Sequence, residues 1–400
     1  MEPLINKYAR KLVGQGLVAP PGPLIGGLGA DLTWNRPDTL QPLLRKVVFG
    51  LDISAILFAR PSEPYFSLIN RLAARMPPDT TALFPEDSET RAFLHELPVV
   101  RELSAGDLIR ALKRRKCAIV PGQGIVTYGT ISPEQAYIVF SSVCFSLFVK
   151  AFADFFDDIQ NGRRDVELES LVMQGKRYYS GCLQRAQSHP PLMTGPFHHR
   201  RDVVDAICEV GRLTVGKQMV DSFFGNVSYR LGDTVYISQT TSSLDSLEGC
   251  IDPCALDDSR CTAITASSEY PAHKGVYLRS DHRAILHGHP KFSVIASLMC
   301  EHRGSCENST ECHIKCSRDR RVGRVPILPG ESGTGPHSIA AVLPGPLIRK
   351  QAAIIYGHGL FTVGKKDFTN AFQRLLDVEK ACFDLYFERI RKRKSSAMSI

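Results

Sequence analysis

The sequence predicts an α/β protein built of two related domains, and three observations lead to this prediction. Its 400 residues are enough for about two to three domains, and 43% apolar with 22% charged residues is an ordinary globular composition. Short apolar runs typical of strands alternate with segments whose apolar residues have helical spacing. Finally, the two halves of the chain resemble each other at two places.

This internal similarity joins two pairs of segments. Residues 55–61 (AILFARP) align without a gap on residues 284–290 (AILHGHP), and residues 116–125 align on residues 351–360. The interval between the segments is also nearly the same, 65 residues from Phe58 to Gln123 and 71 residues from His287 to His358. Self-similarity at matched intervals predicts an internal repeat.

Local signals place the other elements of the first half. Residues 7–18 are predicted as a short helix, and residues 19–37, rich in Pro and Gly, as irregular. Ser132-Pro133-Glu134 predicts the start of a helix that continues through Asp154, because Pro and acidic residues are favoured in a first helical turn. Residues 166–200 are interpreted as a connection between the halves.

The second half has clearer periodicity. Residues 202–219 have apolar positions at helical spacing, and residues 235–237 are predicted as a strand. From Lys366 onward an apolar stripe predicts a long helix that packs in the core or against another subunit.

Three histidines of the second half predict a metal site. His287 and His289 are two residues apart, so on a strand their side chains leave the same face. His358 lies between two glycines, which allow close approach of the backbone. Three imidazoles with one open position suit a catalytic zinc ion, and Glu269 would supply a carboxylate for proton transfer. Taken singly, these patterns are also common among structural histidines.

The first half lacks these ligands. Phe58, Arg60 and Gln123 stand where His287, His289 and His358 stand in the second half. Phe has no lone pair, Arg has no acceptor, and Gln is a weak neutral ligand. We therefore expect residues 1–165 to form a degenerate domain without metal, 166–200 a connecting segment, and 201–400 the metal-binding catalytic domain.

Four motifs in a fixed order carry a resemblance to a known family. They are Gly225-Asn226-Val227-Ser228, Ser267-Ser268-Glu269, His287-Gly288-His289-Pro290 and Gly357-His358-Gly359. In this order they resemble the class II aldolase/adducin family, over roughly residues 201–388. The resemblance implies a three-layer α/β/α fold with a mainly antiparallel central sheet. It also implies that the three histidines bind zinc and that Glu269 is the catalytic acid/base.

The resemblance further implies a site for a substrate phosphate. Asn226, Ser267 and Ser268 match the family's phosphate-binding residues, and Thr240 is assigned to the same site. Thr241 departs from the pattern, because it occupies the usual glycine position and a β-branched residue resists the backbone geometry that glycine permits.

Two more histidines lie near these motifs. By family position, His273 is expected beside the metal ligands or on a helix face, and His282 at the surface.

The function implied is that of a zinc-dependent lyase, with Mn²⁺ or Fe²⁺ as alternative ions. Such an enzyme cleaves a carbon–carbon bond of a hydroxy-carbonyl substrate, expected to be phosphorylated, through an enediolate that the ion stabilises. Epimerases, dehydratases and decarboxylases use similar residues, and a non-haem iron oxygenase or a non-catalytic adducin-like interaction module are further alternatives. The intact histidines and Glu269 favour an enzyme.

One cluster does not belong to the family pattern. Four cysteines, Cys300, Cys306, Cys312 and Cys316, lie close together in the sequence with His302 and His313. Their spacing matches no familiar zinc-ribbon or iron–sulfur signature, so a structural metal, a redox site and free thiols all remain open. The family's tyrosine acid has no counterpart between residues 291 and 351, and His313 is a candidate proton donor in its place.

Charge and hydropathy indicate the protein's surroundings. The net charge of +8 is spread over 49 basic and 41 acidic residues, and no nucleic-acid motif accompanies it. Residues 1–18 lack the apolar core of a signal peptide, and the apolar run 137–149 is too short to cross a bilayer. We expect a cytoplasmic homo-oligomer with a small-molecule substrate and neither nucleic acid nor membrane as partner.

Overall fold

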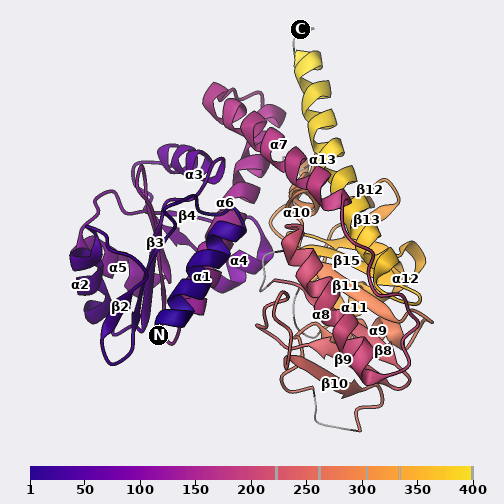
Figure 1. The fold of residues 1–400 in the computed structure, drawn as a ribbon. Helices are drawn as coiled ribbons and strands as arrows, with labels where there is room; N and C mark the ends of the chain where they lie inside the picture. The colour runs from indigo at the N-terminus through magenta and orange to yellow at the C-terminus, as the bar shows by residue number, and fades with distance from the viewer. Residues whose placement is uncertain (221–223, 260–262, 303–304, 332, 334, 398–400) are drawn as a thin grey trace. The chain divides into compact units, whose positions relative to one another are not determined.

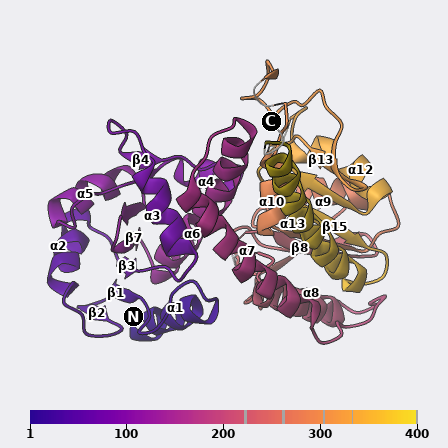
Figure 2. The same cartoon turned by 90° about the horizontal axis from the view of Figure 1, so that it is seen from above.

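The computed structural model describes residues 1–220, 224–259, 263–302, 305–331, 333 and 335–397. The chain forms two compact units, which can be followed in Figures 1 and 2. The N-terminal unit consists of Met1–Phe155 and Arg164–Tyr178, and the C-terminal unit of Phe156–Arg163 and Tyr179–Ile400. The domain limits predicted from the sequence, at residues 165 and 201, stay a prediction.

The N-terminal unit is built on a sheet of five strands in the order β2-β1-β3-β7-β6, with neighbours antiparallel. These strands are β1 (Leu24–Leu28), β2 (Leu32–Trp34), β3 (Ala55–Ala59), β6 (Cys117–Val120) and β7 (Gly124–Gly129). A small second sheet pairs β4 (Ala82–Leu83) with β5 (Leu97–Pro98). The helices are α1 (Glu2–Gly14), α2 (Gln41–Leu51), α3 (Tyr65–Ala74), α4 (Ser88–Leu94) and α5 (Ala105–Arg114). The first parts of α6 (Pro133–Gln160) and α7 (Val166–Gln187) also belong to this unit, and their last parts belong to the C-terminal unit.

The C-terminal unit contains an eight-stranded sheet in the order β10-β9-β8-β11-β15-β14-β13-β12. Only the β13–β14 pair is parallel among the described strands of this sheet. The strands are β8 (Asn226–Leu231), β9 (Thr234–Ser238), β10 (Ile251–Ala255), β11 (Ala284–Gly288), β12 (Arg320–Val322), β13 (Val325–Leu328), β14 (Ala352–Ile355) and β15 (Gly359–Gly364). The helices are α8 (Arg200–Gly216), α9 (Tyr270–Tyr277), α10 (Lys291–Leu298), α11 (Ile339–Val342), α12 (Pro344–Lys350) and α13 (Thr369–Ala397).

Helices cover this sheet because alternate strand residues are apolar on each face. Phe361 and Val363 of β15 belong to one buried cluster with residues of α9, α11 and α12, among them Val276 and Leu347. The helices α10 and α13 pack against β14 and β15 without joining that cluster, and α8 packs against β8. The result is the mixed α/β arrangement with an antiparallel-rich sheet that the sequence predicted (Figure 2).

The central strands of the two sheets share order and register. The order β2-β1-β3-β7-β6 parallels β9-β8-β11-β15-β14. Phe58 pairs with Val126 on β7, and His287 pairs with Phe361 on β15. Likewise Leu24 of β1 faces Phe58, whereas Asn226 of β8 faces His287. Sequence similarity and strand register therefore identify the same positions as equivalent.

Two predictions about the elements need correction, and a third segment, predicted as a connection, contains a helix. Residues 19–37 are not irregular, because they contain β1 and β2; the ring of Trp34 packs over Gly26, where a side chain would collide with it. The first helix is α1, so it begins and ends earlier than residues 7–18. Residues 166–200 contain the 22-residue α7, whose buried residues Leu168, Val172 and Tyr179 recur at helical spacing among many charged ones.

The most apolar helix is longer than the apolar run that marks it. The run 137–149 lies within α6, which has 28 residues and, by length and composition alone, could cross a membrane. Of its most apolar 18-residue window, 89% is buried within the protein. Burial of this kind is typical of a core helix and makes α6 weak evidence for a membrane span.

Candidate metal centre

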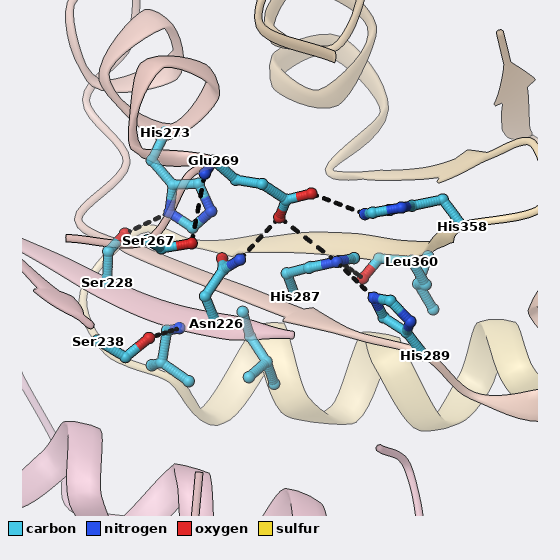
Figure 3. Close-up of polar contacts among 12 residues, drawn as sticks. Asn226, Ser228, Ser238, Ser267, Glu269, His273, His287, His289, His358 and Leu360 are labelled. Carbon is cyan, nitrogen blue, oxygen red and sulfur yellow. Dashed lines mark hydrogen bonds and ion pairs between the residues drawn. The ribbon is translucent and has the colours of Figure 1, made fainter. Parts of the chain in front are cut away.

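Two neighbouring strands bring the three histidines together. His287 lies near the end of β11, with His289 just beyond it, and His358 lies in the turn between β14 and β15. Because β11 and β15 are paired, with Gly288 opposite Leu360, the end of β11 lies beside the start of β15. Residues some 70 positions apart in the sequence therefore share one site, as Figure 3 shows.

The turn that carries His358 requires glycine on both sides. Gly357 has a φ of +63°, a left-handed conformation that glycine adopts without steric cost. A Cβ atom on Gly359 would lie 2.8 Å from Cε1 of His287 and 2.8 Å from Cδ2 of His289. The predicted close approach of this backbone to the other histidines is thus present in the structure.

The three imidazoles are buried and converge. His287, His289 and His358 are 1 to 3% exposed, and one ring nitrogen of each lies within 4.8 Å of the others. The Nε2 atoms of His287 and His289 are 2.9 Å apart. Two nitrogen ligands of a tetrahedral ion lie about 3.3 Å apart when each metal–nitrogen bond is about 2.0–2.1 Å. Within the part of the chain that the structure describes, this is the group that could hold a metal ion.

The protonation of these rings also suits a metal ion. Nδ1 of His287 is 3.1 Å from the carbonyl oxygen of Leu360, so an N–H there donates and leaves the Nε2 lone pair facing the other rings. Burial, and then the neighbouring His287 and His358, hold the pKa of His289 well below its ordinary value. Its buried Nδ1 has no hydrogen-bond partner among the described residues. A neutral His289 can offer a ring-nitrogen lone pair to a divalent ion.

Glu269 lies against the histidines. It is the residue before the first turn of α9 and is 8% exposed. Its Oε1 atom is 2.7 Å from Nε2 of His358, and its Oε2 atom is 3.4 Å from Nε2 of His287 (Figure 3). Burial alone would raise the pKa of Glu269, but the charges of His287 and His358 outweigh burial and hold that pKa below its ordinary value. The carboxyl is therefore ionised at neutral pH and can accept a proton.

Asn226 holds the carboxylate in place. Its Nδ2 donates a hydrogen bond of 2.7 Å to Oε2 of Glu269, and this bond also lowers the pKa of Glu269. Asn226 follows Gly225, which has a φ of +89° and whose Cβ position lies 2.4 Å from the carbonyl oxygen of His287. Only glycine permits that approach. The residue predicted to bind phosphate is thus placed next to Glu269.

The other residues predicted to bind phosphate lie on two adjacent segments. Ser267 is buried, and its Oγ accepts a hydrogen bond of 3.3 Å from the amide of Glu269, whereas Ser268 and Thr240 are exposed. The segments are joined where the amide of Thr240 donates to Thr265 and that of Ser267 donates to Ser238. Thr241 has a φ of +58°, so the chain adopts the geometry usual for glycine in spite of the β-branched side chain.

The remaining histidines lie apart from the three ligands. His273 is buried on α9 with its Nδ1 2.7 Å from Oγ of Ser228, and burial lowers its pKa to about 3. The prediction that His282 lies at the surface is wrong, because it is 4% exposed and burial lowers its pKa. His313 is 3.4 Å from Glu331, and no described contact joins it to Glu269.

The cysteine cluster contains free thiols. Cys300, Cys306, Cys312 and Cys316 are half-buried and form no disulfide in the described part of the chain. The thiol of Cys312 donates to the carbonyl oxygen of Ser309 at 3.4 Å. Residues 303 and 304, inside the cluster, lie outside the described residues. Converging ligand atoms of the kind found in the histidine group are not present among the described cysteines.

Sequence reasoning missed contacts that involve backbone or distant residues. The carbonyl of Leu360 orients His287, and Ser228 links His273 to Tyr277 by hydrogen bonds of 2.7 Å each. A carbonyl has no signature in the sequence. Ser228, by contrast, belongs to the motif that begins at Gly225, and its place in that motif could have indicated a buried role beside the site.

The fold and the converging side chains define an α/β protein with a group of three buried histidines that could hold a metal ion. Residues 205–385 match the family model described as the Class II Aldolase and Adducin N-terminal domain. By this match, residues 205–385 are similar to the class II aldolase/adducin family, whose members typically use a divalent metal and small-molecule substrates.

Solved structures resemble about half of the chain. L-fuculose-1-phosphate aldolase from Thermus thermophilus is 21% identical, with 48% of this chain and 97% of that chain covered and a TM-score of 0.39. A sugar-phosphate aldolase from Thermotoga maritima is 18% identical, with 48% and 95% covered and a TM-score of 0.35. YgbL from Escherichia coli, a candidate aldolase, epimerase or decarboxylase, is 18% identical, with 47% and 89% covered and a TM-score of 0.38. No curated protein matches the chain.

Proposed function

We propose that the C-terminal unit is a zinc-dependent lyase that cleaves a carbon–carbon bond of a phosphorylated hydroxy-carbonyl compound. The observation that carries the proposal is the convergence of three buried imidazoles with an ionised carboxylate, Glu269, in hydrogen-bond contact with one of them. The match of residues 205–385 to the family model supports it independently.

Each side chain has a role in this proposal. His287, His289 and His358 hold the ion, for which Zn²⁺ is the first choice and Mn²⁺ or Fe²⁺ the alternatives, because imidazole ligands suit all three. When bound, a divalent ion acts as a Lewis acid that stabilises negative charge developing on the substrate's oxygen atoms. Glu269 moves the proton, since it is ionised and lies at the edge of the histidine group.

The phosphate of the substrate would lie toward the exposed rim of the site. Thr240 and Ser268 are exposed there, and Ser267 precedes Ser268 and Glu269 in the sequence. Hydroxyl groups and turn amides are common phosphate donors. Asn226 positions Glu269 and is not assigned to the phosphate, because its amide nitrogen already donates to that carboxylate.

The N-terminal unit has a different part in the proposal. We infer that the two sheets arose by tandem duplication, which is supported by the shared strand order and by the matching pairs Phe58–Val126 and His287–Phe361. With Phe58, Arg60 and Gln123 at the ligand positions, this unit binds no catalytic metal. The protein is expected to act in the cytoplasm as a homo-oligomer.

The proposal is tested by metal analysis followed by a substrate screen. Zinc, manganese and iron are measured in protein purified with and without oxygen, because an oxygenase would retain iron only when oxygen is excluded. Phosphorylated ketoses and 2-oxo acids are then screened for release of dihydroxyacetone phosphate, pyruvate or carbon dioxide. Release of an aldol cleavage product supports the lyase. Epimerised or dehydrated products without cleavage would replace it with another reaction of the same site, and a protein without metal or turnover would contradict it.

A further inference from the structure

The helix α10 is tied to the candidate metal centre at both ends. It begins at Lys291, directly after His289 and Pro290. Near its other end, Oγ of Ser297 accepts a hydrogen bond of 2.8 Å from the amide of Gly357, the residue before His358. The position of α10 therefore influences the backbone of two of the three histidines.

A carboxylate from another helix fixes the start of α10. The N-cap residue is Pro290, which has no side chain able to cap the helix. Instead, Oε1 of Glu379 on α13 accepts from the amide of Phe292, and its Oε2 accepts from the amide of Ser293, both at 2.7 Å. An anion at this end also complements the helix dipole. Figure 1 shows α10 beside α13 in the C-terminal unit.

Glu379 has a full set of partners in the protein interior. Besides the two amides, Oγ of Ser293 donates to Oε2 and the hydroxyl of Tyr179 donates to Oε1, again at 2.7 Å each. Glu379 is 0% exposed, so these four donors replace water. Burial raises the pKa of Glu379 and the four hydrogen bonds oppose that rise. A buried carboxylate so completely paired holds its neighbours in one arrangement.

The N-terminal unit supplies an internal comparison. Gly129 and Gly364 occupy equivalent places, since an added Cβ on either would lie 2.0 Å from the carbonyl oxygen of the residue three positions later. Counted from these glycines, Cys144 of α6 stands where Glu379 stands on α13. The helices α3 and α10 also differ in where they begin. After Arg60-Pro61, α3 begins at Tyr65, whereas α10 begins directly after Pro290. A cysteine thus stands at the position equivalent to Glu379, and near the start of α3 a carboxylate of the preceding segment, Oε2 of Glu63, accepts from the amide of Ser67 at 3.2 Å.

We propose that Glu379 is a positioning residue for the metal centre: by fixing α10 it sets where His289 and His358 stand. This inference rests on the proposed function, because it assumes that the three histidines bind an ion. It assigns Glu379 no contact with substrate or ion. Glu379 acts on the histidines through α10: it binds the amides of Phe292 and Ser293 at one end of the helix, and Ser297 binds the amide before His358 at the other end.

The test compares metal affinity in full-length variants. Zn²⁺ dissociation constants are measured by competition with a chelator at 10 °C, after circular dichroism has shown that each variant is folded. In Glu379→Gln the side-chain N–H₂ group must face a backbone N–H of α10, so one hydrogen bond to the helix start is lost. We expect zinc affinity to fall about 10- to 100-fold, the usual effect of losing a residue that orients metal ligands. Glu379→Asp, which keeps the charge, should recover part of the affinity.

Controls separate positioning from general stability. Asp384→Asn removes an exposed carboxylate of the same helix, paired with Lys380, and should leave zinc affinity unchanged. Ser297→Ala removes the link to Gly357, together with the hydrogen bond of 2.6 Å that Oγ donates to the carbonyl oxygen of Val294 within α10. It should weaken zinc binding on its own, even if Glu379→Gln does not fold. If wild-type protein binds no zinc, the proposed function fails. The positioning role is overturned if wild-type protein binds zinc and both Glu379→Gln and Ser297→Ala bind it with wild-type affinity. If Glu379→Gln is unfolded, wild-type zinc affinity in Ser297→Ala overturns the positioning role.

Discussion

Nε2 of His358 lies 2.7 Å from Oε1 of Glu269, so the third histidine and the carboxylate are in direct contact although 89 residues separate them. The contact orients the carboxylate toward the group formed by His287 and His289. It also means that variants at these positions must be compared for metal content as well as for turnover, since a loss of activity alone would not say which of the two was affected.

Replacing one histidine should abolish metal binding. In His289→Ala one of three converging nitrogens is lost, and we expect nearly all bound metal to disappear because three protein ligands hold a catalytic ion. The metal content per chain is measured by elemental mass spectrometry. Arg60→Ala, at the equivalent position of the other unit, should keep full occupancy. Full occupancy in His289→Ala would show that the ion lies elsewhere.

Replacing the carboxylate should separate binding from chemistry. Glu269→Gln keeps the shape and can still contact His358, but it cannot accept a proton. We expect metal content to stay near that of the wild type while turnover of the substrate found by screening falls by about a hundredfold or more. If turnover is unchanged in Glu269→Gln, the role of Glu269 is structural and not catalytic.

The pH dependence of stability can be tested in the N-terminal unit. Burial would raise the pKa of Asp165, but its hydrogen bond from Leu168 and its contacts with Arg71 and Arg75 hold that pKa below the ordinary value. A lowered pKa in the folded state adds stability above the unfolded value of about 4, and this stability is lost as the pH falls through the folded value.

Asp165→Asn should therefore lower the free energy of unfolding by about 1 kcal/mol at pH 7 and by less at pH 3. Trp34 is the only tryptophan in the sequence and lies in the same unit, so its fluorescence follows the relevant transition. A deficit of the same size at both pH values would indicate that packing, not the charge, is responsible.

The cysteine cluster should support structure and leave the chemistry unchanged. Cys312 bonds to the backbone of its own segment, and burial raises the pKa of its thiol, which makes it a poor nucleophile. Substituting Cys306 and Cys312 with Ser should lower the melting temperature without changing the zinc content. A further ion lost with the double substitution would reveal a second metal site, and unchanged stability with lost activity would point to a thiol or His313 as proton donor.

Much of the candidate site could be predicted from the sequence because its residues have local signatures. The spacing of His287 and His289 on a strand and the glycines around His358 indicate close approach without any coordinates. By contrast, β1 and β2 were hidden by the Pro and Gly residues around them, since tertiary pairing with β3 decides their structure. Burial of His282 likewise depends on neighbours far away in the sequence.

The role of Asn226 shows a similar limit. Its motif indicated a ligand-binding turn, but its contact with Glu269 depends on how β8 is placed beside β11. The four donors around Glu379 come from α7 and α10, distant in the sequence from α13, and no periodicity connects them. Contacts of this kind depend on tertiary packing and cannot be predicted from the spacing of residues in the sequence.

The shared register of the two sheets has a consequence for how the metal is acquired. In the N-terminal sheet the pair Phe58–Val126 keeps the same register that His287–Phe361 has in the other, although no histidine is there to bind an ion. We therefore expect the strand framework to assemble without metal, unlike small domains that are unfolded until zinc binds. A chain that is already folded would then take up the ion, and the ion that it carries would reflect the supply it meets after synthesis, because ligand preference alone separates such ions poorly.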